Sequence, residues 1–182
     1  MKHKFLSVFL LAFVFVICAN AADYASISGE PLSSLNQQTN VVVFKCNAVN
    51  AKINGKTYDN YLKSLDNKQK AKYDKDIEKL KKYIIKRFNK TNKKGFQLTE
   101  HSADYLPADG QVTADINITS LSFADKKGRA KISATIDIRK QGSQQTVTQI
   151  RLTNFEGAKK SGMSSQLQQL AKDIIEYIAI YL

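Results

Sequence analysis

Strict alternation of apolar and polar residues between positions 112 and 139 constrains the fold of this chain more than any other feature. Two segments carry apolar side chains at every second position: Val112, Ala114, Ile116 and Ile118, then Ala130, Ile132, Ala134, Ile136 and Ile138. Successive side chains of a strand point to opposite faces of its sheet, so each segment predicts a strand with one packed face and one wet face. Leu121 and Phe123 fall out of this phase, which predicts a β-bulge near Thr119 or Ser120.

Several further segments have strand character. Residues 41–44 read Val-Val-Val-Phe, residues 96–99 follow Gly95, and residues 146–153 follow a Gln-Gly-Ser turn. Asn54-Gly55 lies between two short segments and predicts a type I′ hairpin. Together with the two alternating segments, these features predict a mostly antiparallel sheet.

The segment 63–94 predicts a long amphipathic helix. Its apolar residues recur at helical spacing: Tyr73, Ile77, Leu80, Ile84 and Phe88. Lysines recur with the same spacing, about 200° away on the opposite side: Lys75, Lys79, Lys82, Lys86 and Lys90. We expect Asp66 to cap the N-terminus, Glu78 and Lys82 to pair, and Gly95 to end the segment, with a short helical piece around Tyr61 preceding it.

Positive charge is concentrated in this helix. Residues 63–94 contain 13 Lys or Arg and 4 Asp or Glu, a net charge of +9, whereas the whole chain carries +12. The five spaced lysines are therefore the candidate binding residues for an anionic partner. A solvated outer face is the alternative interpretation of the same lysines.

A second amphipathic helix is predicted at the C-terminal end of the chain. Ser165 and Gln168 have the spacing of a capping box. The apolar stripe consists of Leu167, Leu170, Ala171, Ile174, Ile178 and Tyr181.

These elements predict one α+β domain over residues 41–182, a two-layer sandwich with both helices on one face of the sheet. The expected order is β-α-β-β-β-β-α, with a small hairpin after the first strand. Residues 22–40 are polar, without an apolar period, and we expect a flexible lead-in there.

Residues 1–21 have the pattern of a secretory signal peptide. Lys2 and Lys4 precede an apolar run over 5–18, and Ala19-Asn20-Ala21 offers small residues for cleavage. The run is too short for an ordinary membrane span. We expect a secreted or periplasmic protein after cleavage near Ala21, and favour a bacterial envelope. Lipidation at Cys18 is disfavoured, because Phe15 and Ile17 stand where a lipobox requires Leu and a small residue.

Catalytic and metal-binding groups are scarce. After cleavage, Cys46 is the remaining cysteine and His101 the remaining histidine, which is too few for a usual zinc site. Cys46 alternates with apolar residues, which predicts a buried, inert thiol rather than a nucleophile paired with His101. We expect no cofactor, no metal and no enzymatic activity.

Three stretches resemble the small α/β domain shared by the TolB N-terminal region, the penicillin-binding-protein activator LpoB and the curli secretion protein CsgG. They are residues 41–44, the passage from helix to strand through Gly95 and Phe96, and the meander 112–153 followed by an amphipathic helix. The resemblance implies an envelope domain that is not catalytic and docks onto other proteins. It supplies no site residue.

Three classes of function remain. An envelope accessory domain that binds another protein is favoured. The alternative is electrostatic binding of an anionic envelope polymer or membrane surface through the lysine face. A hydrolase using Asp115 and Asp137 on adjacent strands is disfavoured, because an ordinary polar sheet exterior explains both residues. Nucleic acid is not an expected partner, because Tyr73 and Phe88 belong to the predicted core and leave no stacking platform.

Overall fold

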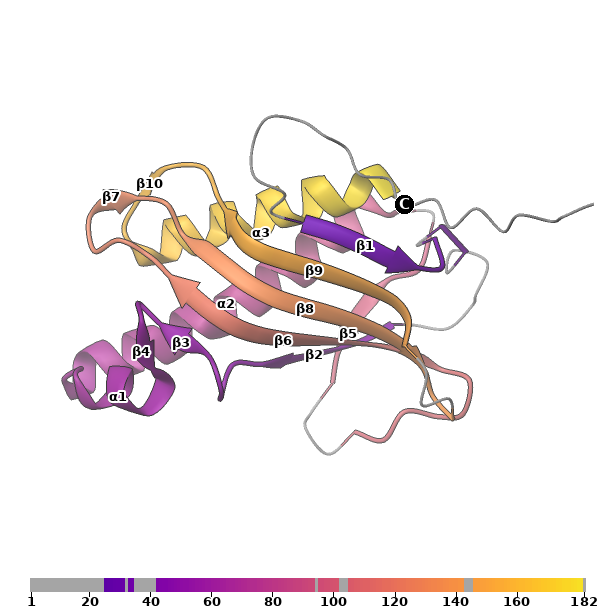
Figure 1. Cartoon of the computed structure of the whole chain (residues 1–182), viewed down its shortest axis with the longest axis horizontal. Coiled ribbons are helices and arrows are strands. Elements are labelled where there is room, and N and C mark those ends of the chain that lie inside the picture. Colours follow the sequence, from indigo (N-terminus) through magenta and orange to yellow (C-terminus); the bar gives the residue numbers. More distant parts are fainter. Residues whose placement is uncertain are drawn as a thin grey trace, which may run out of the picture.

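The computed structural model in Figure 1 describes residues 25–31, 33–34, 42–93, 95–101, 105–142 and 146–181. The elements follow in the order β1 (Ala25–Gly29), β2 (Val42–Asn47), β3 (Lys52–Ile53), β4 (Lys56–Thr57), α1 (Tyr58–Lys63), α2 (Asn67–Thr91), β5 (Leu98–Glu100), β6 (Val112–Ser122), β7 (Lys127–Gly128), β8 (Lys131–Lys140), β9 (Thr146–Glu156), β10 (Lys160–Ser161), α3 (Met163–Ile178) and η2 (Ala179–Tyr181). The signal-peptide prediction for residues 1–21 lies outside the described residues.

The main sheet has the strand order β1-β9-β8-β6-β2-β5. β1, β9, β8 and β6 pair antiparallel, whereas β2 runs parallel to both β6 and β5. The predicted hairpin forms as β3 and β4, with positive φ at Asn54 (48°) and Gly55 (80°), and β3 also pairs with β6. The predicted α+β class with a mostly antiparallel sheet is confirmed.

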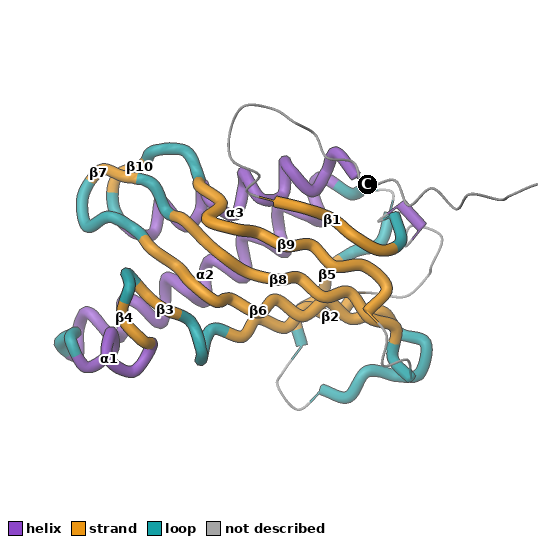
Figure 2. Tube along the Cα trace, viewed as in Figure 1, coloured by secondary structure: helices purple, strands orange, loops and turns teal. Residues whose placement is uncertain are grey.

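Helices α2 and α3 lie on one face of this sheet and run in the same direction (Figures 1 and 2). Their apolar faces and the inward residues of β6, β8 and β9 form one buried cluster. The alternation in β6 is interrupted by a register shift between Ile118 and Ser120, as predicted, and the shift returns Leu121 to the core at 1% exposure. The two layers are therefore joined by a single apolar interface.

Helix α2 is shorter than predicted. It begins at Asn67, ends at Thr91 and has Asn92 as its C-cap, so Gly95 does not end it. Asp66 and Gln69 form a capping box: the Asp66 carboxylate accepts from the Gln69 N–H (2.7 Å), and Gln69 Oε1 accepts from the Asp66 N–H (3.0 Å). On the predicted apolar stripe, Ile77 is half-buried and the other four residues are buried.

Helix α3 begins earlier than predicted. Gly162 is its N-cap, with φ +74° and no side-chain capping bond, so the capping box at Ser165 was wrong. The chain turns sharply from β10 into the helix at this glycine, which places Ser165 within the first turn. Gln166 is fully buried there instead, and its side chain bonds the backbone of Ala124 and Lys126.

The expectation of a flexible lead-in over residues 22–40 was wrong for residues 25–29. These form β1, which pairs with β9 at the edge of the sheet, and Tyr177 Oη donates to the Ala25 carbonyl (3.1 Å). Ala25 and Ile27 pack against the core, whereas Ser26 and Ser28 are exposed. Two apolar residues were too few for the alternation to stand out in the sequence.

Replacing Asp66 with Ala should lower the free energy of unfolding by about 1 kcal/mol, because the N-cap bond to Gln69 is lost. Urea denaturation measures the change. Asp74→Ala, at an exposed position of the same helix, is the control and should stay within about 0.5 kcal/mol. Equal effects of the two substitutions would contradict the capping role.

Replacing Ile27 with Ala should cost about 1 to 2 kcal/mol, because a half-buried side chain loses its contact with the core. The neighbouring Ser28→Ala should be nearly neutral, since Ser28 faces solvent. Thermal unfolding of both variants measures the difference. A lead-in without fixed structure would make the two substitutions indistinguishable.

Candidate functional site

The five candidate lysines lie on the outer side of α2, where Lys79 is half-buried and the other four are exposed. Lys79 Nζ lies 3.4 Å from Asp76 Oδ1, and Lys82 Nζ lies 3.9 Å from Glu78 Oε2, the pair predicted from the sequence. Lys86 and Lys90 form no ion pair within the described part of the chain. Lys75 forms none there either, so uncompensated charge lies at both ends of the row of five lysines.

The last turns of α2 border a groove between α2 and α3 with a volume of about 290 Å³. We call it the basic groove, and its lining residues are Tyr83, Lys86, Arg87, Lys90, Gln168 and Lys172. Four of the six are cations, supplied by both helices. The structure thus brings together two of the five predicted residues and leaves Lys75, Lys79 and Lys82 outside the groove.

Arg87 and Lys172 converge on one carboxylate, that of Glu176 in α3. Arg87 Nη2 lies 2.7 Å from Glu176 Oε1, and Lys172 Nζ lies 3.6 Å from the same oxygen. This contact joins α2 to α3 beside the groove. Four cations and one carboxylate leave a local excess of positive charge.

Sequence reasoning missed Arg87 and Lys172. Helical spacing identifies residues that share a face of one helix, but it does not say which second helix lies beside that face. The available signals were that Arg87 is the sole arginine of residues 63–94, and that Lys172 and Glu176 are spaced i,i+4.

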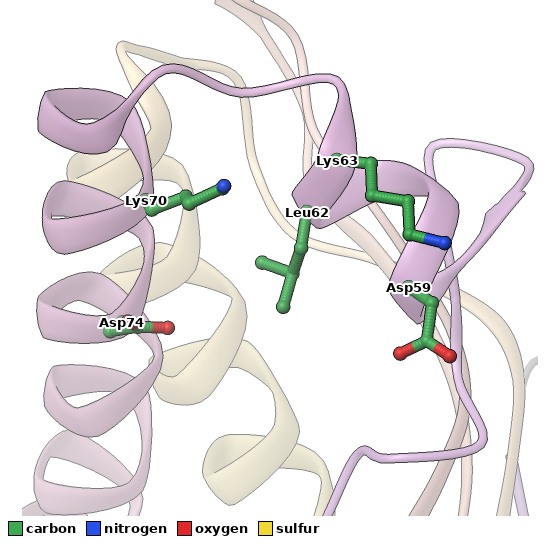
Figure 3. A pocket seen from close by; sticks show the side chains of 5 residues that line it. All are labelled: Asp59, Leu62, Lys63, Lys70 and Asp74. Carbon is green, nitrogen blue, oxygen red and sulfur yellow. The ribbon is translucent and has the colours of Figure 1, made fainter.

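A second cleft of about 290 Å³ lies between α1 and α2 (Figure 3). Asp59 and Lys63 extend from α1, Lys70 and Asp74 extend from α2, and Leu62 lies between the two pairs. Two carboxylates balance two ammonium groups there. This cleft therefore has no net charge with which to select an ion.

Asp115 and Asp137 are direct cross-strand partners in the β6–β8 ladder, as the sequence suggested. Asp137 is buried and accepts from Gln149 Nε2 (2.8 Å) and Asn117 Nδ2 (3.4 Å), while Arg139 lies 3.6 Å away. The two amide donors and the arginine satisfy the Asp137 carboxylate, as in a structural polar network on the outer face of the sheet. The arrangement gives the hydrolase interpretation no support.

Cys46 is a half-buried free thiol in β2. Burial raises its pKa to about 11, against the lowering effect of Lys81, while Glu78 adds to the rise. His101 stacks on Tyr105, with ring centroids 3.8 Å apart. A raised pKa keeps the thiol protonated near neutral pH. The side chain is half-buried rather than buried as predicted, and its inertness stays a prediction.

Within the described residues, no cluster of three or more His, Cys, Asp or Glu side chains could hold a metal ion. No described helix is long and apolar enough to cross a membrane.

Comparison with known proteins does not identify a family. No protein-family model and no curated protein matches the sequence. Two matching solved structures are the PelC dodecamer from Paraburkholderia phytofirmans (8% identity, TM-score 0.42, covering 85% of this chain and 96% of that chain) and a point variant of it (10%, 0.41, 85% and 97%). Neither is TolB, LpoB or CsgG. The likeness is too distant to carry an argument about function or assembly.

The Cys46 thiol should react with iodoacetamide at least tenfold more slowly in the folded protein at pH 8 than in the urea-unfolded chain. The pKa of a cysteine returns to about 8.5 on unfolding, so the reactive thiolate becomes far more populated. Mass spectrometry of the Cys46 peptide separates this thiol from Cys18. The rate in the folded protein should rise as the pH approaches 11; equal folded and unfolded rates at pH 8 would refute an inert thiol.

Proposed function

We propose that this protein is a non-catalytic envelope accessory domain, secreted or periplasmic, that binds an anionic envelope polymer through the basic groove. The observation that carries the proposal is the convergence of Lys86, Arg87, Lys90 and Lys172 from two helices around one groove, whose described lining residues include no carboxylate. The leader-like residues 1–21 support the compartment.

The chemistry of the groove favours a chain with repeated charges. Lysine ammonium groups are point charges on flexible stems, so several of them can follow spaced anions without demanding one ligand shape. Lys86 and Lys90 are exposed and carry no compensating acid within the described residues, so their field reaches into solvent. Attraction of this kind weakens with salt, because exposed charges are screened over about 8 Å at physiological ionic strength.

The sequence favoured binding of another protein. The basic groove supports that function only for an acidic partner. An acidic protein segment would use the same four cations. A polymer is preferred here because charged and polar side chains border the groove, and several flexible ammonium groups suit repeated anions.

Replacing Lys86 and Lys90 together with Gln should reduce affinity for anionic polymers about tenfold, since each lost contact is worth about 0.7 kcal/mol in high dielectric. The measurement is fluorescence anisotropy with labelled polyphosphate and with labelled polygalacturonate, at low and at moderate salt. Co-sedimentation with cell-wall sacculi and with anionic vesicles then measures binding to two anionic materials of the cell envelope.

The matched control is Lys68→Gln with Lys75→Gln, which removes the same charge from exposed positions of the same helix outside the groove. Its affinity should fall about twofold or less. Equal losses in the two double variants would show attraction to net charge alone and refute the groove. Absence of binding to every polymer and surface would refute the proposed function.

A further inference from the structure

Of the two donors on one edge of the Arg87 guanidinium, Nε–H and Nη2–H, only one has a hydrogen-bond partner among the described residues. Nη2 donates to Glu176 Oε1 at 2.7 Å, whereas the buried Nε–H has no hydrogen-bond partner among the described residues. An unsatisfied buried donor is rare in folded proteins and calls for an explanation. The adjacent Nε and Nη2 donors form a planar fork that matches an acceptor with two oxygens.

Glu176 supplies a single oxygen to this fork and is exposed to solvent. Its Oε1 also lies 3.6 Å from Lys172 Nζ, and its side chain is 48% exposed. An exposed carboxylate can turn into water with little loss, because surface ion pairs contribute little to stability. A competing anion in solution can therefore reach the Glu176 carboxylate and its two cations.

Resting on the proposed binding role of the basic groove, we infer that the group bound there is a terminal phosphate, gripped by the Arg87 fork after Glu176 is displaced. Nε is covered in the free protein, so the guanidinium turns as Glu176 leaves and presents both donors to the phosphate. The same displacement releases Lys172 for the ligand.

The number of cations favours phosphate over carboxylate. A carboxylate has two oxygens, and the Arg87 fork occupies both. A terminal phosphate has three free oxygens and a charge of about −1.5 to −2 at neutral pH, so its third oxygen and remaining charge are available to the lysines of both helices. Lys86, Lys90 and Lys172 line the same groove as Arg87.

Isothermal titration with sodium tripolyphosphate tests this assignment. Arg87→Lys keeps the charge but removes the fork, and should weaken binding about tenfold. Its control is Arg129→Lys, in a separate Arg–Glu pair with Glu156, which should change the affinity less than twofold. Thermal unfolding of each variant confirms that it is folded.

Removing the internal competitor should have the opposite effect. Glu176→Gln should tighten tripolyphosphate binding about threefold to fivefold. Glu78→Gln is the control: it removes one negative charge from α2 at a position outside the groove, and should change the affinity less than twofold. A loss of affinity in Glu176→Gln, or no loss in Arg87→Lys, would overturn the inference.

Vesicles distinguish a lipid source of the phosphate from a soluble one. Binding to phosphatidic acid but not to phosphatidylglycerol vesicles at equal surface charge indicates a membrane-borne terminal phosphate. Binding to tripolyphosphate without binding to either vesicle indicates a soluble one, and both results support the assignment. Equal affinity for galacturonate oligomers and tripolyphosphate would overturn it.

The failures of the two proposals are distinguishable. If polyanions bind and the Lys86/Lys90 variant loses affinity while Arg87→Lys does not, the groove binds anions but the terminal-phosphate assignment falls. If no polyanion binds, both proposals fall.

Discussion

Removal of the inward face of β6, β8 and β9 from water is the interaction on which the rest of this structure depends. Residues such as Ile116, Ile132 and Ile150 are almost fully buried, and the helices α2 and α3 cover them. Apolar burial is non-directional, so it fixes that two amphipathic helices must lie on this face. The contacts between α2 and α3 then follow from how the two helices divide this sheet face between them.

The basic groove is a consequence of that division. Both helices turn their apolar stripes to the sheet and lie side by side. Their outer sides meet where α2 carries Arg87 and α3 carries Lys172 and Glu176. The middle of α2 behaves differently, because Asp76, Glu78 and Glu100 lie near Lys79, Lys81 and Lys82 and offset their charge. Within the described residues, lysines without an ion pair therefore lie on either side of this middle part, at Lys75 and at Lys86 and Lys90.

Elements with a strong local signal were predicted from the sequence. The alternation of β6 and β8, the bulge after Ile118, the Asn54-Gly55 hairpin and the cap at Asp66 each depend on a few neighbouring residues, and each was confirmed. β1 and the start of α3 were missed. β1 is defined by its pairing with β9, more than a hundred residues away, and α3 begins where Gly162 lets the chain turn.

The sequence alone determined the fold class, the side of α2 that faces solvent and the lysines exposed on it, because periodicity and capping act within one element. Tertiary structure decided which of those lysines line a groove with a cation of a second helix. Lys86 and Lys90 lie beside Arg87 and Lys172, whereas Lys79 and Lys82 lie beside acids. The physical reason is that electrostatic excess depends on distances between charges, and distances across two helices are set by packing against a shared sheet.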